Sequence, residues 1–361
     1  MLVENDRTLE DPAKLAGDYL NARRAELAQF AMHRQYSQQP ELESGYSERQ
    51  KIHALEDMNY HLQYLAEAVT RESPLLFEDY LRWLKVFLPR VGVGEGDVLN
   101  SLAAVKETLS EMMPAGLAVV PTRYLAEGMI RMTTLPGDLP TMLGETAPMA
   151  LLATQYLNSL LRADRRTASC LILEEVEKGM PVRDLYLGVF QPVQLEIGRL
   201  WQLGKITVAQ EHFCTAATQM VMSQLYPLIF RQERNGRTFV ASCISGELHE
   251  IGLRFVADFF EMGGWDTYYL GANVPPTAII SSLKEQKADL LGISATMPFH
   301  LSKVEALIRD VRQSGVGRRV KIMVGGYPFT LDPDLWRKVG ADGSARDAEE
   351  AVRVGEQLLA G

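Results

Sequence analysis

Residues 239–252 read FVASCISGELHEIG, and this stretch decides the fold of the carboxyl-terminal part of the chain. Its first half is an apolar, β-branched run, which predicts a buried strand, and a helical pattern starts near residue 250. Glu247 and His249 therefore fall on the loop at the carboxyl end of that strand. In parallel α/β sheets, ligands bind at this edge.

The same alternation continues to the end of the chain. Five short apolar runs predict strands, namely FVASCIS, DTYYLG, ADLLGISAT, RVKIMVGG and ADGSA. Helical patterns lie between and after them, near residues 250–262, 276–286, 300–314, 332–338 and 347–359. Strands separated by helices predict a parallel, doubly wound sheet of flavodoxin-like order, in which the first, third and fourth strands are neighbours.

Polar residues and glycines follow these three neighbouring strands. They are Glu247, His249, Gly252, Ser294, Thr296, Gly325 and Gly326. We expect them to converge on one rim, where the glycines let a bulky group pass close to the backbone. Each feature alone also fits an ordinary loop, since a lone histidine is most often a surface residue and a Gly-Gly pair most often a turn.

The pattern ExHxxG, SxT and GG resembles the DxHxxG, SxL and GG pattern of cobalamin-binding domains, and the resemblance covers residues 150–360. It implies that His249 is the lower axial cobalt ligand and that Glu247 orients it. Gly252 would permit close backbone approach where the helix begins. The resemblance also implies a slot for the nucleotide tail of the cofactor. The residues expected at this slot are Ser294, Thr296, Gly325 and Gly326.

Residues 149–231 carry a helical pattern that is broken at residues 179–181, at Gly204 and at Pro227. Four helices of this length predict a small bundle. Thr207 and Gln210 have the spacing of a helix capping box. The polar tract RQERNGR at residues 231–237 predicts a linker.

Trp201, Glu211 and His212 form a W-x9-EH pattern in this bundle. With the E-x-H motif, it resembles the light-sensing cobalamin repressors of the CarH type. That resemblance implies that the bundle caps the upper face of the corrin and that these three residues line the pocket of the upper axial group. Gln202 stands where the repressors have the histidine that ligates cobalt after photolysis, so His212 or water would have to replace it. Without the resemblance, Trp201 fits the bundle core and His212 a satisfied buried histidine.

Residues 1–140 are helical and acidic. They hold 14 Lys and Arg against 21 Asp and Glu, which is −7 of the net charge of −9. Helical periodicity starts near Glu48, again at Ser73-Pro74 and at Val98, and a Pro- and Gly-rich connection follows at 133–148. The repressors begin with a basic winged-helix DNA-binding domain, whereas this region is acidic, so we expect no nucleic-acid binding.

The helical pattern of residues 61–88 resembles the N-terminal extension of the photocobilins. These are cobalamin photoreceptors with biliverdin as a second chromophore. The resemblance implies a non-covalent bilin, because this region contains no cysteine. The candidate bilin contacts are His61, Tyr64 and Arg82. The same three residues also fit packing and surface positions on amphipathic helices.

Length and composition limit the number of domains, the role of the cysteines and the location of the protein. A length of 361 residues favours two or three domains, for which we expect the bounds 1–140, 149–231 and 238–361. Three cysteines without metal-like spacing exclude a disulfide framework and a zinc cluster. The N-terminus MLVENDRTLEDPAK lacks a signal layout and no apolar run approaches about 18 residues, so we expect a cytoplasmic protein without a membrane partner.

Three functions are compatible with these patterns. The leading hypothesis is a light sensor without enzyme activity, in which photolysis of a cobalt–carbon bond changes domain packing and the assembly of a homo-oligomer, and so signals to an effector. The alternative is a corrinoid methyl carrier of a methyltransferase system. A third is a cofactor-free, response-regulator-like interaction module. The sequence leaves open whether the upper ligand is adenosyl or methyl.

Overall fold

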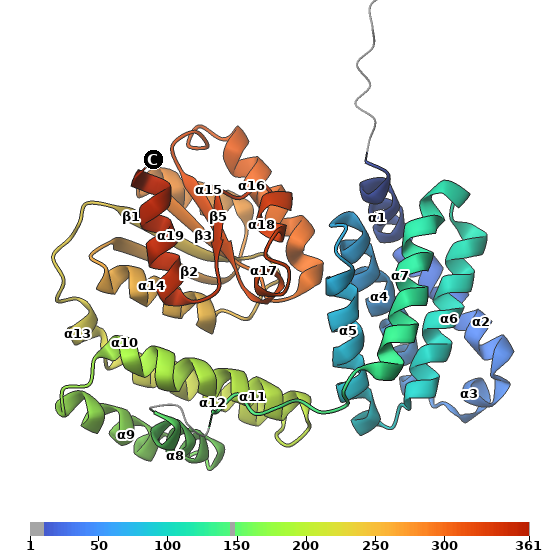
Figure 1. Cartoon of the computed structure of the whole chain (residues 1–361), viewed down its shortest axis with the longest axis horizontal. Coiled ribbons are helices and arrows are strands. Elements are labelled where there is room, and N and C mark those ends of the chain that lie inside the picture. The colour runs from blue at the N-terminus through green and yellow to red at the C-terminus, as the bar shows by residue number, and fades with distance from the viewer. Residues whose placement is uncertain (1–10, 145–148, 361) are drawn as a thin grey trace, which may run out of the picture. The chain divides into compact units, whose positions relative to one another are not determined.

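The computed structural model of the chain describes residues 11–144 and 149–360 (Figure 1). The chain forms two compact units, Met1–Gly137 and Asp138–Gly361. The expectation that the N-terminus carries no signal falls mostly on residues 1–10, which lie outside the described residues. The end of the predicted connection at 133–148 also lies outside them.

The first unit consists of packed helices. They are α1 (Pro12–Ala22), α2 (Arg24–Gln38), α3 (Pro40–Gly45), α4 (Glu48–Thr70), α5 (Pro74–Phe87), α6 (Glu95–Met112) and α7 (Ala115–Thr134), with a 3-10 turn, η1, at Leu88–Val91. The predicted periodicity of α4 is observed, because Met58, Leu62, Leu65 and Val69 are all buried. Its start is fixed by a capping box at Ser47.

Two helix starts in this unit differ in detail from the sequence prediction. Helix α5 begins at Pro74, but no side-chain cap forms, and the Ser73 hydroxyl has no hydrogen-bond partner among the described residues. Helix α6 begins at Glu95, three residues before Val98. There the Asp97 carboxylate accepts the Gly94 N–H at 3.1 Å and so caps the helix inside the glycine-rich turn.

The second unit begins with a helical bundle. Its helices are α8 (Ala150–Leu161), α9 (Arg165–Glu177), α10 (Val182–Leu185), α11 (Gln191–Gln202), α12 (Val208–Ser223) and α13 (Tyr226–Ile229), and a π-helical turn, η2, spans Tyr186–Phe190. The capping box predicted for Thr207 and Gln210 is present at the start of α12. The π turn lies between α10 and α11 and turns Tyr186 into the core.

A five-stranded, all-parallel sheet follows. Its strands are β1 (Thr238–Ile244), β2 (Asp266–Val274), β3 (Leu290–Ser294), β4 (Lys321–Gly325) and β5 (Gly343–Ala345). The spatial order is β2-β1-β3-β4-β5. The flavodoxin-like prediction is therefore confirmed. Strands β1, β3 and β4 are neighbours, with Cys243 opposite Ser294 and Ser294 opposite Gly325.

Helices cover both faces of the sheet (Figure 1). They are α14 (Ile251–Met262), α15 (Pro276–Glu285), α16 (Leu301–Gln313), α17 (Tyr327–Leu331), α18 (Leu335–Lys338) and α19 (Ala348–Ala360), with a 3-10 turn, η3, at Pro298–His300. Helices α14 and α19 pack together on one face, and α15 and α16 on the other. Helix α17 was not foreseen, because its five residues are too few to show a helical period.

The bundle is joined to the α/β domain by a buried carboxylate. Asp258 on α14 accepts hydrogen bonds from the Tyr186 hydroxyl at 2.6 Å and from the Tyr226 hydroxyl at 3.0 Å. Arg254, one turn earlier on the helix, donates to Tyr226 at 3.3 Å. Burial raises the pKa of Asp258 to about 6, although both hydroxyls and Arg254 favour its charged form.

This junction predicts a pH-dependent stability. The pKa of Asp258 is higher in the folded chain than its ordinary value of 3.8, so its contribution to stability is full below about pH 4 and is lost as the pH rises through about 6. The difference is worth on the order of 3 kcal/mol. We expect urea unfolding between pH 4.5 and 7.5 to show this loss in the wild type and not in Asp258→Asn. Parallel stability curves for the two proteins would contradict it.

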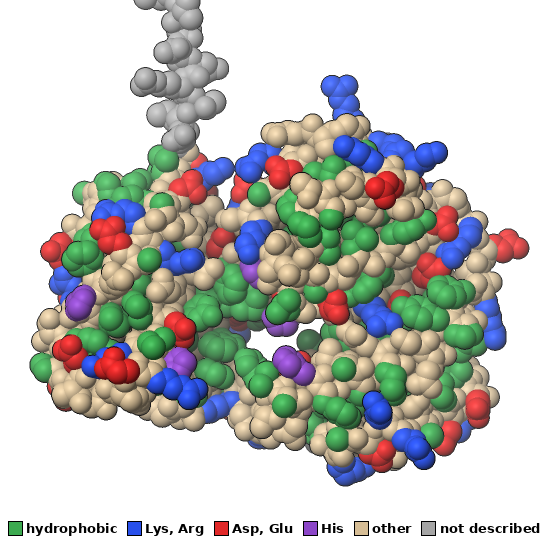
Figure 2. All heavy atoms as spheres, turned by 180° about the vertical axis from the view of Figure 1, so that it is seen from behind, with side chains coloured by type: hydrophobic (Ala, Val, Ile, Leu, Met, Phe, Trp, Pro, Cys, Tyr) green, Lys and Arg blue, Asp and Glu red, His purple; other side chains and the backbone are tan. Residues whose placement is uncertain are grey.

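The surface mixes side chains of all kinds. Figure 2 shows apolar, acidic and basic side chains intermingled over the face in view. Among the described residues, no helix combines the length and the apolar character needed to cross a membrane.

Candidate functional site

The loops after β1 and β3 meet at the carboxyl edge of the sheet. The backbone N–H of Thr296, just beyond β3, donates to the Glu247 carboxylate at 2.8 Å, and the N–H of Met297 donates to the same oxygen at 3.1 Å. The structure thus brings together the motif residues of the first and third strands. Strand pairing places Gly325 beside Ser294 at the same edge.

Glu247 is the centre of this rim. Its side chain is 1% exposed. Oε1 accepts from the backbone N–H groups of Leu248 and His249, each at 3.0 Å, and from Nδ1 of His249 at 2.6 Å. Burial alone would raise the pKa of Glu247, but hydrogen bonds from two histidines and the backbone outweigh it and hold this pKa well below its usual range. Glu247 is therefore an ionised acceptor.

His249 uses one of its two ring nitrogens to bond Glu247. Because the ionised Glu247 can only accept, Nδ1 of His249 carries the proton and Nε2 keeps a lone pair, which is the kind of donor that metals bind. The His249 side chain is 59% exposed. The hydrogen bond to Glu247 is the main cause that raises the pKa of His249, and the charge of Glu211 adds to it.

Two further rim residues were missed in the sequence. Asn273, at the end of β2, has a left-handed backbone with φ of 55°. Its side chain accepts the N–H of Gly246 at 2.8 Å, and its own N–H donates to the Glu247 carbonyl at 3.0 Å. It therefore clamps the loop that carries His249. The signal that could have found it is the asparagine after a glycine and an alanine at a strand end, since asparagine tolerates left-handed backbone.

The second missed residue is His300, in the turn η3. It is buried, and its Nδ1 lies 3.1 Å from Oε2 of Glu247. Lys303, one turn further along, donates to the Ser245 carbonyl at 3.1 Å. A histidine six residues after Ser294 at the amino-terminal end of a predicted helix was the available signal.

The two hydroxyl residues are positioned differently from each other. Ser294 is the last residue of β3 and is 8% exposed. Thr296 lies beyond the strand, where its contact with Glu247 is made by the backbone N–H rather than by the hydroxyl. The predicted contacts of both hydroxyls with a nucleotide tail remain predictions.

The glycines also differ. A Cβ on Gly326 would lie 2.1 Å from the Ala295 carbonyl oxygen. The backbone φ of Gly326 is 105°, a conformation that residues with a side chain rarely adopt. Gly326 is thus required by the protein's own backbone. A Cβ on Gly325 would make only an ordinary contact, 3.5 Å from the Ala345 carbonyl, and for Gly252 none lies within 4 Å among the described residues. Gly325 and Gly252 are the glycines that leave room at the rim.

The predicted upper-face residues come from the bundle. Trp201, at the end of α11, is partly buried against the core, and Gln202 is next to it. At the start of α12, Nδ1 of His212 bonds the Glu211 carboxylate, whose other oxygen accepts from Thr215 at 3.2 Å. The His212 side chain is 74% exposed. The bundle thus carries a second Glu–His pair, and its Glu211 lies close enough to His249 to raise the pKa of that residue.

The candidate bilin residues belong to the first unit. His61 is 2% exposed, and its ring nitrogens bond the Tyr80 hydroxyl at 2.7 Å and the Ser101 hydroxyl at 3.0 Å. Tyr64 stacks on Tyr80, with ring centroids 4.0 Å apart. Arg82 is exposed on α5. Because His61 is buried and both its ring nitrogens are bonded, its ring is not open to a bilin. Helical spacing in the sequence could not show that this side chain is buried.

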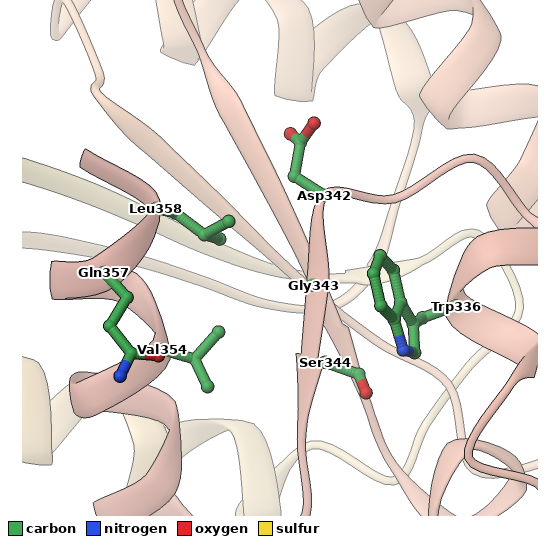
Figure 3. Close-up of a pocket in the computed structure, with 7 residues that line it drawn as sticks. All are labelled: Trp336, Asp342, Gly343, Ser344, Val354, Gln357 and Leu358. Atoms are coloured by element: carbon green, nitrogen blue, oxygen red, sulfur yellow. The ribbon is translucent and has the colours of Figure 1, made fainter. Parts of the chain in front are cut away.

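The described side chains do not build a cage for a bare ion. Among the described residues, no group of three or more His, Cys, Asp or Glu could hold a metal. A single open histidine fits a metal whose other ligands come from a macrocycle. A cavity of about 300 Å³ lies elsewhere, beside β5, and is lined by Trp336, Asp342 and α19 residues (Figure 3). None of the rim residues lines it.

Comparisons with known proteins agree on one cofactor. Residues 237–353 match a family described as B12 binding domain, and residues 152–226 match a second family with that description. Dimethylamine corrinoid protein 3 of Methanosarcina acetivorans is 31% identical over 195 residues, which are 52% of this chain and 89% of that protein. The dimethylamine corrinoid protein of Methanosarcina barkeri is 32% identical over 171 residues, 46% of this chain and 78% of that protein.

A solved structure shows the same fold. The Methanosarcina barkeri monomethylamine corrinoid protein superposes with a TM-score of 0.52 at 20% identity, over 58% of this chain and 99% of that one. Both family matches lie in the second unit. The first unit has no part in them.

The prediction of a light sensor is wrong. The relatives are methylamine corrinoid proteins, and none of this similarity points to a photoreceptor of the CarH or photocobilin kind. The error has a physical cause: the E-x-H and W-x9-EH patterns describe groups around the corrin and carry no information about what the bound cobalt does. Signalling, light-dependent assembly and biliverdin as a second chromophore have no support from the relatives.

Proposed function

The chain belongs to the corrinoid proteins with B12-binding domains, and from this we propose that it is a methyl carrier that works with a methyltransferase, with methylated amines as the source of the methyl group. The observation that carries the proposal is the similarity to dimethylamine corrinoid proteins over 89% of the length of one of them. The Glu247–His249 pair supports it, because a carrier needs one fixed ligand below the metal and an accessible face above it.

The residues of the rim fit the cofactor. His249 would hold the metal through Nε2, since Nδ1 is fixed by Glu247 and the side chain is largely exposed. Gly325 and Gly252 would leave space for the nucleotide tail and the corrin edge, because a side-chain atom at either position meets no close neighbour. When bound, the corrinoid supplies a metal centre that takes up and gives away a methyl group.

The bundle would cover the other face. Glu211 and His212 would form its polar edge, with Glu211 holding the orientation of His212. Trp201 would add an apolar surface. In this arrangement the chain binds, orients and shields the cofactor, and the partner methyltransferase performs the bond-making chemistry. We therefore propose a carrier rather than an enzyme.

Methyl transfer with and without a partner tests this proposal. The chain, loaded with cobalamin and reduced with titanium(III) citrate, is given dimethylamine either alone or with a purified dimethylamine:corrinoid methyltransferase. We expect the absorption spectrum to change to that of the methylated corrinoid only when the enzyme is present. Methyl iodide serves as the chemical control, because it should methylate the reduced protein without any enzyme.

Two results would contradict the proposal. Methylation from dimethylamine without the methyltransferase would make the chain itself an enzyme. A chain that methyl iodide methylates but that no methylamine methyltransferase accepts as a partner would refute methylated amines as the methyl source.

A further inference from the structure

A chain of polar side chains crosses the core of the bundle. It begins at Tyr156 on α8, which is fully buried and whose hydroxyl lies 3.1 Å from that of Thr218 on α12. The amide of Gln194 on α11 follows, with Nε2 2.8 Å from the Thr218 hydroxyl and Oε1 3.1 Å from the Thr215 hydroxyl. The Thr215 hydroxyl also lies 3.2 Å from Oε1 of Glu211. Three helices thus contribute to one chain that ends at Glu211.

The end of this chain lies at the proposed cofactor site. The other oxygen of Glu211 bonds Nδ1 of His212. The charge of Glu211 also contributes to the raised pKa of His249 on the rim. About two turns further along α12, Gln219 donates to Glu250, the residue after His249, at 3.4 Å. The amino-terminal part of α12 therefore faces the loop that carries His249.

The number of hydrogen atoms in the chain limits its direction. Its four contacts need one hydrogen each. A hydroxyl supplies one hydrogen, and Glu211, as a carboxylate, supplies none. If the amide oxygen of Gln194 faces Thr215, the single hydrogen of Thr215 must serve both Gln194 and Glu211. One of the two contacts is then left as two oxygens with no hydrogen between them.

The opposite orientation of the amide supplies every contact. The oxygen and the nitrogen of an amide occupy nearly equal space, so Gln194 fits its site either way round. When it is turned end for end, its oxygen accepts from Thr218 and its NH2 group donates to Thr215. The Thr215 hydrogen is then left for Glu211. Tyr156 donates to Thr218, so each contact has its own hydrogen.

We propose that Gln194 is a positioning residue for the upper side of the cofactor, because its NH2 group faces Thr215 and directs the Thr215 hydroxyl to Glu211. Glu211 is then held at both oxygens, by Thr215 and by His212. Because a carboxylate only accepts, His212 keeps its proton on Nδ1 and a lone pair on Nε2. The buried end of the chain at Tyr156 thus sets the state of an exposed histidine. Placing Glu211 and His212 on the upper side of the cofactor is the one step that rests on the proposed function.

Nuclear magnetic resonance of the full chain, loaded with diamagnetic methylcobalamin, tests the orientation of the amide. The readout is the nuclear Overhauser effect from the Gln194 NH2 protons to the methyl groups of Thr215 and Thr218. We expect the stronger effect to Thr215. A stronger effect to Thr218 would overturn the proposal.

Three variants test what this orientation does. Gln194→Glu keeps the shape but can only accept, so it should take the Thr215 hydrogen away from Glu211. Thr215→Val removes the hydroxyl, and Thr215→Ser is the matched control that keeps it. The readout is the tautomer ratio of the neutral His212 ring, taken from its nitrogen-15 shifts, with His212→Gln to assign the signal. We expect about a tenfold excess of the Nδ1–H form in the wild type and in Thr215→Ser, and no excess in Gln194→Glu and Thr215→Val.

Several results would count against this role of Gln194. They are a wild-type ratio in Gln194→Glu or in Thr215→Val, a lost excess in Thr215→Ser, and no excess in the wild type. If Gln194→Glu does not fold, the Overhauser effects of the wild type and the two Thr215 variants decide the question. A chain that shows the expected ratios but fails in methyl transfer would refute the carrier function and leave the role of Gln194 standing.

Discussion

Replacement of His249 by alanine is expected to abolish the nitrogen splitting of the bound Co(II) corrinoid and to weaken cobalamin binding by about tenfold to a hundredfold. The reason is that His249 is the one rim side chain that offers an open nitrogen fixed by a buried carboxylate. The substitution also removes a hydrogen bond to the buried Glu247 carboxylate, so we expect a loss on the order of 1–3 kcal/mol in the free energy of unfolding. Electron paramagnetic resonance of the Co(II) form measures the nitrogen splitting, equilibrium titration with cobalamin measures the affinity, and urea unfolding measures the stability.

The chain offers a matched control for this substitution. His53 on α4 is exposed to a similar extent, 57%, and pairs with Glu56 at 3.0 Å, so it is also a histidine held by a glutamate. His53→Ala should leave splitting and affinity unchanged. If the splitting survives in His249→Ala and disappears in His212→Ala, the ligand comes from the bundle and the orientation of the cofactor proposed here is reversed.

Substitution of the adjacent glycines should separate folding from binding. Gly326→Ala forces a side chain to within 2.1 Å of the Ala295 carbonyl at a φ of 105°, and we expect a loss on the order of 3 kcal/mol in the free energy of unfolding. Gly325→Ala meets nothing closer than 3.5 Å and should change that free energy by less than about 1 kcal/mol. It should nevertheless weaken cobalamin binding, because its methyl group enters the space left for the tail.

Urea unfolding and cobalamin titration of both variants test this pair. The wild type provides the reference for each measurement. A Gly325→Ala protein that binds cobalamin as tightly as the wild type would show that the tail does not pass this residue. A Gly326→Ala protein of unchanged stability would show that the loop after β4 can move away from Ala295.

The parts of the site that could be predicted from the sequence depend on short-range patterns. Glu247 and His249 are two residues apart, so any loop after β1 brings them close together. The alternation of strands and helices predicts a parallel, doubly wound sheet, and the flavodoxin-like order of such a sheet brings Ser294 and Gly325 to the same edge.

The parts that could not be predicted depend on long-range contacts. His300 bonds a carboxylate 53 residues away, and Asn273 holds a backbone group 27 residues away. Neither pairing leaves a periodic trace in the sequence. The π turn at Tyr186–Phe190 has the same apolar composition as an α-helix, so the sequence could not reveal how Tyr186 reaches Asp258. The function was misjudged because pocket-lining residues are common to proteins that use the same cofactor differently.

The Asn273 clamp has a consequence for the thermodynamics of cofactor uptake. Its left-handed backbone and its two bonds to Gly246 and Glu247 hold the histidine loop through contacts that the chain itself supplies. The conformational entropy of this loop is therefore lost during folding and not during binding. Calorimetry should accordingly find a smaller entropic penalty for cobalamin binding to the wild type than to Asn273→Gly, whose loop must become ordered as the cofactor arrives.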